Sequence, residues 1–233
     1  MAIRAGTSGF SYAEWKGDFY PEDLSSKDML SYYASQLPAV EINNTFYRMP
    51  NPDVLTSWAE QTGEEFRFVL KASRRITHFK RLNGAEEEVE YFLRTAVQLG
   101  DRLGAVLFQL PPNFKKDVPR LSAFLDLLGE PSRTAFEFRH PSWEDEEVVE
   151  LLRARGAALC TADTEEKAGE IVRTGPLGYL RLRKADYDDA ELAEWADRVV
   201  EAGWDDAFVF FKHEDDAGGP RMARRFLEKV TSR

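Results

Sequence analysis

Eight short apolar runs, most of them followed by a stretch with helical periodicity, constrain this chain more than any other feature. Strands that alternate with helices pair in parallel, and eight is the strand number of the (β/α)8 barrel. The 233 residues are an ordinary length for one such domain. The sequence therefore predicts an α/β fold, a single small TIM-like barrel over residues 1–233. The predicted strands are Ile3–Gly6, Val40–Asn43, Phe66–Lys71, Ala105–Leu110, Ala135–Arg139, Ala158–Thr161, Tyr179–Arg183 and Phe208–Lys212.

Helix boundary signals support the predicted alternation. Asn51 followed by Pro52 is typical of a helix start, with a capping side chain before a proline in the first turn. Ser142, with Asp145 three residues later, indicates another start, and Gly156 indicates the end of that helix. The predicted helices are Lys27–Gln36, Pro52–Gln61, Glu86–Leu99, Pro119–Leu128, Glu144–Arg155, Asp189–Ala202 and Pro220–Val230.

The connection between predicted strands six and seven departs from this pattern. Residues Thr161–Gly178 show no convincing helical periodicity, so the sequence predicts an atypical connection there. An open, doubly wound sheet is the alternative architecture, because it too is built from alternating strands and helices.

Composition narrows the class of protein. The single cysteine, Cys160, cannot form an internal disulfide, and no segment approaches the roughly 20 apolar residues of a membrane span. The N-terminus has no apolar stretch of signal-peptide length, so we expect a cytoplasmic protein with no membrane partner. A net charge of −10 opposes a nucleic-acid partner, because proteins that bind duplexes usually present a basic surface. The sequence leaves the oligomeric state open.

Charged residues inside strands predict where a site lies. In the predicted fifth strand, Phe136 and Phe138 share one face, and Glu137 and Arg139 share the other. The aromatic face suits the helix layer, so the charged face should point into the barrel. Because these polar positions fall near the carboxyl ends of the strands, we expect a site at that end of the barrel.

The same alternation in the other strands predicts a ring of polar side chains above the barrel interior. Asn43 belongs beside this ring, and three histidines, His78, His140 and His213, lie at strand ends or soon after them. A structural ion-pair network that closes the barrel is the alternative interpretation, because buried charges need partners whether or not they catalyse. The predicted ring is Glu41, Lys71, Gln109, Glu137, Arg139, Asp163, Arg181 and Lys212.

Loop residues after the strands add further candidates. Tyr12 and Tyr47 are aromatic residues on the predicted ligand face, where they would stack on a ligand or pack under a loop. For Trp15, Phe19 and Trp143, we favour packing. The segment from Gly218 opens the last predicted helix, and its Gly219 suits a phosphate site or an ordinary helix entry.

The chain resembles the YecE-like family, a family of unknown function, in six ordered motifs that cover nearly its whole length. The resemblance implies a barrel fold and no settled activity. The motifs are Gly6–Tyr12 with Trp15 and Phe19–Pro21; Glu41–Arg48 with Pro50; Phe66–Phe68 with Lys71, Thr77 and His78; Phe108–Pro112; Glu137–Pro141 with Trp143; and Ala162–Asp163.

Two segments depart from this family pattern. After strand seven the family commonly has a His-Gly pair, where this chain has Leu182-Arg183-Lys184 after Arg181. After strand eight the family often has asparagines, where this chain has residues 211–215, Phe-Lys-His-Glu-Asp. We therefore expect a different charge on that side of the pocket.

The polar ring suits an enzyme that acts on a small anionic substrate, a carbohydrate or a phosphorylated molecule. The reaction class, whether hydrolase, lyase or isomerase, stays open. Carboxylates in unlike environments can divide acid and base roles, histidine moves protons near neutral pH, and Arg and Lys hold anions. The catalytic candidates are Glu137, Glu41, His140, Lys71 and Asp163. The substrate-binding candidates are Tyr12, Asn43, Tyr47, His78, Gln109, Arg139, Arg181, Lys212 and Gly219.

Other functions stay open at this point. A divalent metal would find oxygen ligands in Glu41, Glu137, Asp163 and Gln109, but the neighbouring Lys and Arg residues argue against a dedicated cation site. A non-catalytic protein that binds a small metabolite would use the same ring. An enzyme that processes a nucleic-acid phosphodiester is a further alternative, which the net charge disfavours.

Overall fold

All strands of the computed structural model, which describes residues 1–129, 133–212 and 216–233, belong to one parallel sheet. Their order is β6-β5-β4-β3-β2-β1-β9-β8-β7. Paired strands are therefore consecutive in sequence, except β1 and β9, which pair where the two ends of the chain meet. The strands are β1 Ala2–Ser8, β2 Ala39–Ile42, β3 Arg67–Lys71, β4 Leu103–Gln109, β5 Thr134–Glu137, β6 Ala158–Leu159, β7 Thr161–Asp163, β8 Leu177–Leu182 and β9 Asp206–Phe211.

The two outermost strands of this order close the barrel. β6 pairs with β5, β7 pairs with β8, and Cys160 alone separates β6 from β7. The Cys160 backbone N–H still donates to the Phe136 carbonyl at 2.9 Å. β6 and β7 are therefore the two halves of one bent strand, and the sheet is the predicted eight-stranded barrel rather than an open sheet.

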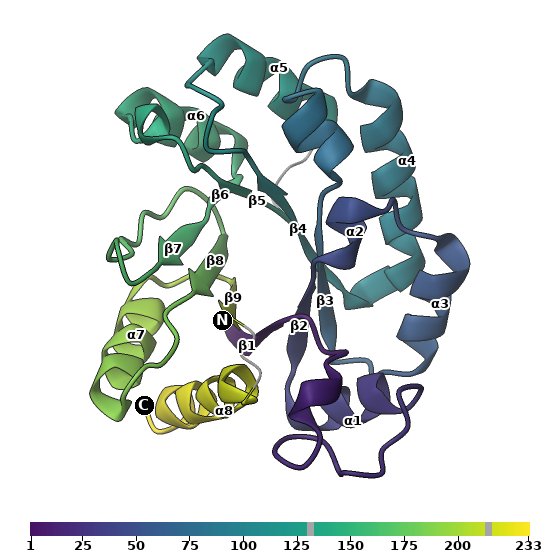
Figure 1. Cartoon of the computed structure of the whole chain (residues 1–233). Helices are drawn as coiled ribbons and strands as arrows, with labels where there is room; N and C mark the ends of the chain where they lie inside the picture. The colour runs from purple at the N-terminus through teal and green to yellow at the C-terminus, as the bar shows by residue number, and fades with distance from the viewer. Residues whose placement is uncertain (130–132, 213–215) are drawn as a thin grey trace.

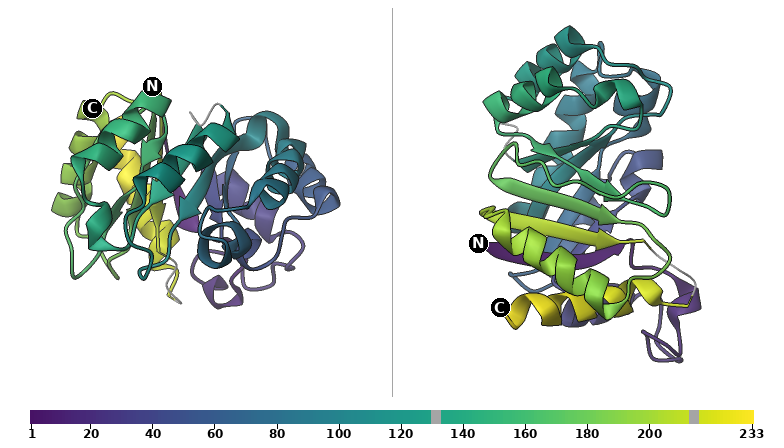
Figure 2. Two further views of the ribbon diagram at one scale, coloured as in Figure 1. Left: turned by 90° about the horizontal axis from the view of Figure 1, so that it is seen from above. Right: turned by 90° about the vertical axis from the view of Figure 1, so that its left-hand side faces the viewer.

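The helices lie outside the strands, as Figure 1 shows, and Figure 2 shows α7 and α8 against one side of the sheet. They are α1 Met29–Gln36, α2 Asn44–Tyr47, α3 Pro52–Glu60, α4 Glu86–Ala96, α5 Val118–Leu128, α6 Glu146–Arg155, α7 Asp189–Glu201 and α8 Gly218–Thr231. Short 3₁₀ turns are η1 Ala13–Trp15, η3 Val97–Arg102 and η5 Pro141–Trp143, and η2 Arg75–Phe79 is a π-helix. Within the described chain, no helix is long and apolar enough to cross a membrane.

The predicted atypical connection is confirmed, since residues 164–176 form no helix. Side-chain hydrogen bonds hold this segment in place of a helix. Thr174 Oγ1 donates to the Ala157 carbonyl at 2.6 Å, and the Gly169 N–H donates to Asp163 Oδ1 at 2.8 Å. These bonds attach the middle of the connection to Asp163 of β7 and its last part to Ala157, the residue before β6.

The helix boundary signals were right at two places and wrong at one. The Asn51 side chain accepts from the Asp53 N–H at 2.9 Å, and Gly156 ends α6 in the left-handed conformation with φ of 67°. Asp145, not Ser142, caps α6, because the Asp145 side chain accepts the Glu147 N–H at 2.9 Å. Ser142 lies in η5, the turn before this helix.

Strand alternation separates two layers of apolar side chains. Residues such as Ile42, Phe136 and Leu182 pack outward against the helices, and a second cluster fills the barrel interior. The interior cluster is Ala39, Val69, Ala105, Leu107, Ala135, Ala158, Cys160, Leu177, Tyr179, Phe208 and Phe210. This filled interior supports the polar side chains that lie above it at the carboxyl ends of the strands.

Aromatic residues of the first loop, and of the loops after β4 and β5, extend the helix-facing core. Trp15 and Phe19 are buried with ring centroids 5.7 Å apart, and Trp143 is buried against Phe114 at 5.4 Å. These three side chains are buried, as the prediction that they pack under loops requires.

Candidate functional site

Arg181 joins two carboxylates that come from opposite sides of the barrel. Its Nη1 donates to Glu137 Oε2 at 2.6 Å, and its Nη2 donates to Glu41 Oε1 at 2.8 Å. All three side chains are at most 5% exposed. The alternation that placed them inside the barrel is therefore correct, and they form one buried ion-pair network.

The remaining carboxylate oxygens are also occupied. Glu41 accepts hydrogen bonds from Ser8 Oγ at 2.8 Å, from Tyr179 Oη at 2.7 Å and from Asn43 Nδ2 at 3.2 Å. Ser8, Tyr179 and Asn43 thus hold Glu41 from β1, β8 and the end of β2.

Glu137 is held in the same way by two further donors. Gln109 Nε2 donates to Glu137 Oε1 at 2.8 Å, and Arg139 Nε donates to the same oxygen at 3.0 Å. Arg139 is 42% exposed, so it reaches from the buried network to the open end of the barrel. With Arg181 counted, both Glu137 oxygens accept charged donors.

This network fixes the protonation states of its members. Burial alone raises the pKa of Glu137, but Arg181 and Arg139 outweigh it and bring the pKa to about 2. Burial also opposes ionisation of Glu41, yet Arg181 and Tyr179 hold its pKa below the ordinary value. Both carboxylates are ionised at neutral pH, so neither is a ready proton donor there.

Lys71 lies at the end of β3, beside the network but outside its ion pairs. It is 9% exposed, and its Nζ lies 4.3 Å from the centre of the Phe46 ring. Among the described residues, no carboxylate oxygen lies within 4.0 Å of this ammonium group. Burial, and then repulsion from Arg181, lower the Lys71 pKa to about 8, although Glu41 and Glu137 partly oppose that shift.

Arg183 brings a further cation to the same end of the barrel. Its Nη1 is buried and has no hydrogen-bond partner in the described part of the chain, and the same holds for Arg181 Nε. Burial, and then repulsion from Arg181, lower the Arg183 pKa. Two buried N–H donors of the site therefore have no acceptor among the described residues.

His78 lies close to Lys71 but is not a proton shuttle near neutral pH. Its Nδ1 lies 2.9 Å from Thr77 Oγ1, and its ring meets Phe46 edge to face at 4.8 Å. Burial, and then repulsion from Lys71, lower its pKa to about 4. The ring is therefore neutral at pH 7 and offers a hydrogen bond rather than a charge.

Two predicted catalytic residues, His140 and Asp163, lie outside the ion-pair network. His140 Nδ1 accepts the Ser142 N–H at 3.1 Å, which makes His140 the cap of η5. Asp163 binds the Gly169 N–H and accepts from Tyr187 Oη at 2.7 Å, so it anchors the helix-free connection. The hydrogen bonds of both side chains are thus made to nearby loop residues and not to the ion-pair network.

The predicted binding residues Tyr12, Tyr47 and Lys212 lie in three different environments. Tyr12 Oη donates to the Ser8 carbonyl at 2.7 Å, and burial, then the Glu41 charge, raise the Tyr12 pKa to about 12. Tyr47 is 66% exposed, and the Arg74 guanidinium lies 5.7 Å from its ring centre. Lys212 follows β9, on the interior-facing alternation of that strand, and is half-buried.

The last predicted helix entry has a packing explanation. A Cβ atom at Gly219 would lie 2.5 Å from the Lys212 carbonyl oxygen, so a side chain does not fit. The carboxylate of Asp216 already accepts the Gly218 N–H at 3.0 Å at this helix start. Close packing therefore accounts for this glycine, and the phosphate site at Gly219 stays a prediction. His213 lies outside the described residues.

Sequence reasoning missed four members of the site. Arg183 shares the alternation of Arg181 and lies in the segment expected to change the charge of the pocket, but the predicted ring did not include it. Tyr179 lies on the same face of this strand. Ser8 was missed because the first strand was predicted to end at Gly6, two residues too early. Phe46 carries no signal of its own, since its place over Lys71 depends on the fold of the β2–α2 connection.

Together, Lys71, Arg139, Arg181 and Arg183, with the carboxylates Glu41 and Glu137, form what we call the mouth cluster. Four cations stand against two anions, so the cluster carries a net positive charge inside a protein of net charge −10. The arrangement suits an anion that enters the carboxyl end of the barrel.

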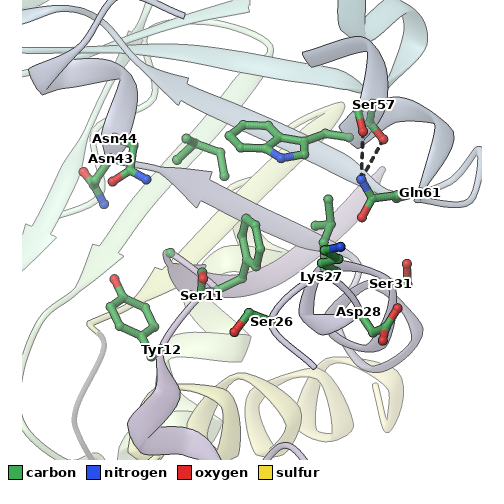
Figure 3. Close-up of a pocket in the computed structure, with 15 residues that line it drawn as sticks. Ser11, Tyr12, Ser26, Lys27, Asp28, Ser31, Asn43, Asn44, Ser57 and Gln61 are labelled. Atoms are coloured by element: carbon green, nitrogen blue, oxygen red, sulfur yellow. Dashed lines mark hydrogen bonds between the residues drawn. The ribbon is translucent and has the colours of Figure 1, made fainter. Parts of the chain in front are cut away.

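A groove lies beside the mouth cluster, between α1 and α3. Its volume is about 740 Å³. Figure 3 shows Tyr12, Asn43 and Asn44 at one end of it and Ser57 and Gln61 at the other. We call it the α1–α3 groove. Asn43 donates to Glu41, and Tyr12 donates to the backbone of Ser8, whose side chain also holds Glu41. The Tyr12 end of this groove is therefore the end nearer the mouth cluster.

Comparisons with known proteins agree with the fold. The family model described as "Protein of unknown function DUF72" matches residues 4–233. The chain belongs to this family. A solved DUF72 family protein from Thermotoga maritima superposes with a TM-score of 0.84 and 28% sequence identity, covering 99% of this chain and 100% of that one. The resemblance seen in the sequence motifs is thereby confirmed.

Curated relatives match over part of their length. The chain is 36% identical over 141 residues to the UPF0759 protein YecE of Escherichia coli, which is 58% of this chain and 52% of the relative. It is 30% identical over 164 residues to the UPF0759 protein YunF of Bacillus subtilis, or 65% and 57% of the two chains. The matched segments thus span little more than half the length of these relatives.

Proposed function

We propose that this protein is an enzyme that acts on a small anionic substrate, a carbohydrate acid or a phosphorylated carbohydrate, at the mouth cluster. One observation carries the proposal: the site has more buried cationic donors than its carboxylates use. The Arg183 Nη1 and Arg181 Nε donors have no partner in the described structure. A bound carboxylate or phosphate would satisfy them, and charge-assisted bonds of this kind are about twice as strong as neutral ones.

Lys71 is the proposed acid–base group. With a pKa of about 8, about a tenth of its side chains are neutral at pH 7, which places it near the best range for proton transfer. Its position beside Arg181, and outside any ion pair, puts it next to the proposed anion. The Phe46 ring at 4.3 Å limits the directions that its Nζ can take.

The two carboxylates have a different proposed role. Glu137, with a pKa of about 2, is a weak base, and its oxygens are occupied by Gln109, Arg139 and Arg181. Glu41 is held by four donors, those of Ser8, Asn43, Tyr179 and Arg181. We infer that both orient Arg181 toward the substrate and do not move protons themselves.

Turnover in heavy water tests the proposal. Sugar phosphates and sugar acids are incubated with the protein in D₂O and followed by ¹H and ³¹P NMR, for the wild type and for Lys71→Met. We expect one class to show deuterium incorporation, elimination or phosphate release with the wild type, and none with the variant. Lys115→Met, at an exposed lysine of a neighbouring loop, is the matched control and should keep full activity.

Two results would overturn the proposal. Equal turnover by the wild type and by Lys71→Met would remove Lys71 from the reaction. Binding of these anions at the mouth cluster with no chemistry in any of them would show a binding protein instead of an enzyme.

A further inference from the structure

The α1–α3 groove differs in chemistry from the mouth cluster that it meets. Its lining includes one lysine and one aspartate, Lys27 and Asp28, both exposed, so it carries no net charge. Most of its other polar groups are hydroxyls and amides, including those of Ser11, Ser31 and Asn44. Neutral donors and acceptors of this kind match uncharged hydroxyl groups better than they match phosphates or carboxylates.

The base of the groove is apolar and aromatic. Trp58 lies parallel to Phe68, with ring centres 5.8 Å apart, and Phe10 meets Trp58 edge to face at 6.1 Å. Both Phe10 and Trp58 are partly exposed. A rigid aromatic base under neutral polar walls suits a ligand with apolar C–H faces and hydroxyl edges, which is the pattern of a sugar ring.

Hydrogen bonds of two lining residues link the groove to the mouth cluster. Tyr12 and Asn43 line it, and Asn43 Nδ2 donates to Glu41 at 3.2 Å. Tyr12 Oη bonds to the backbone of Ser8, whose side chain bonds to Glu41. A ligand unit in the groove therefore lies next to a unit in the barrel mouth. The volume of about 740 Å³ is in the range of sites for small organic ligands.

We propose that the α1–α3 groove binds the uncharged sugar units of an anionic oligosaccharide, while its charged unit enters the mouth cluster. This inference rests on the proposed function for the charged unit, and it adds the neutral part of the substrate. The substrate is then longer than a single sugar phosphate, and the groove selects for that length.

Trp58 provides a specific signal for the test. The other four tryptophans, at positions 15, 143, 195 and 204, are at most 5% exposed, and Trp58 is partly exposed at the groove. The probes are neutral maltotetraose, cellotetraose and tetra-N-acetylchitotetraose, and anionic tetragalacturonate. We expect saturable changes in tryptophan emission with at least one neutral probe, and loss of those changes in Trp58→Phe.

A matched pair of variants locates the binding. Ser57→Tyr places a bulky side chain inside the groove, and Thr56→Tyr places the same side chain on an exposed position of α3 outside the lining. We expect Ser57→Tyr to weaken binding of the neutral probe at least tenfold and Thr56→Tyr to change it less than twofold. Circular dichroism confirms that both variants fold.

The outcomes separate the groove from the mouth cluster. Lys71→Met should leave neutral-probe binding unchanged and weaken tetragalacturonate binding. A neutral probe that binds while tetragalacturonate shows no dependence on Lys71 would support the groove and oppose the proposed function. No response to any neutral probe, or equal binding by Ser57→Tyr and the wild type, would overturn the groove proposal.

Discussion

The buried base of the site and its open end are built in opposite ways. Below, Arg181 is matched by Glu41 and Glu137, and every carboxylate oxygen has a donor. Above, Lys71 has no carboxylate within ion-pair distance in the described structure, and Arg183 keeps a buried N–H without a partner. A satisfied network stabilises a fold, whereas an unsatisfied one is maintained at the expense of stability and is typical of functional sites. The contrast agrees with our proposal, in which the lower layer holds the fold and the upper layer binds the substrate.

The largest effect should come from breaking the lower layer. Arg181→Met leaves the buried Glu41 without an ion-pair partner and Glu137 with Arg139 alone, and loss of one partner of a buried pair typically costs about 3–5 kcal/mol. We expect the Tm to fall by roughly 6–20 °C for a chain of this size, measured by calorimetry at pH 7. Arg198→Met, on the barrel exterior, is a control for the loss of an arginine. A change in Tm no larger than that of the control would show that the lower layer does not hold the fold together.

The second effect is a loss of stability in acid. The pKa of Glu137 is about 2 in the folded protein and 4.5 for an ordinary glutamate, so its contribution is full above pH 4.5 and is lost as pH falls toward 2. A shift of this size corresponds to about 3 kcal/mol. Urea unfolding between pH 7 and pH 2 should show this loss for the wild type. In Glu137→Gln the loss should be smaller by about that amount, and parallel curves for the two proteins would contradict the buried pairing.

The third effect has the opposite sign, because it lies in the upper layer. Lys71 has a folded pKa of about 8 against 10.5 for an ordinary lysine, so the unfolded chain binds more protons between these values. Stability should therefore rise with pH across this window, and Lys71→Met should be more stable than the wild type below pH 8. We expect a gain of about 2 kcal/mol, after allowance for the lost contact with Phe46.

The pH dependence of that gain separates it from simple packing. The stability of Lys71→Met and the wild type should converge as pH rises from 8 to about 10.5, because Lys71 loses its charge there. Chemical denaturation at pH 7, 9 and 10.5 measures the difference. If Lys71→Met is less stable than the wild type at pH 7, the charge of Lys71 stabilises the folded protein through favourable interactions. That result would contradict a lowered Lys71 pKa.

The smallest effect on stability is expected at Arg139, which links the two layers. Its side chain is 42% exposed, and exposed ion pairs contribute only about 0–1 kcal/mol. Arg139→Gln should therefore change the Tm by less than about 4 °C but weaken sulfate binding severalfold, as titration calorimetry would show. A large fall in Tm with unchanged sulfate binding would assign Arg139 to the lower layer.

The sequence predicts the barrel and the lower layer well, because both follow from strand alternation. Glu41, Gln109, Glu137 and Arg181 have inward positions that a period of two residues fixes. The pattern even indicates the connection without a helix between β7 and β8. These features depend on local spacing, which a single sequence contains.

The loops around the site could not be predicted to the same degree, because their conformations depend on contacts between distant segments. Nothing near His140 in the sequence shows that its ring caps η5, and nothing near Asp163 shows that it anchors a loop. The α1–α3 groove combines a long first loop with two helices, and no single segment indicates it. Past the end of a strand, the direction of a side chain depends on the conformation of the loop. The two-residue alternation of a strand does not predict that conformation.

Sulfate binding as a function of pH tests the central claim, that Lys71 and Arg183 form an anion site above two carboxylates whose oxygens all have donors. Sulfate keeps its charge between pH 7 and 9.5, so a change in affinity reports on the protein. We predict that titration calorimetry shows wild-type affinity falling by about tenfold as Lys71 loses its proton, and affinity that is weaker and independent of pH for Lys71→Met. Wild-type affinity that does not change with pH, or Lys71→Met affinity equal to that of the wild type, would contradict the account.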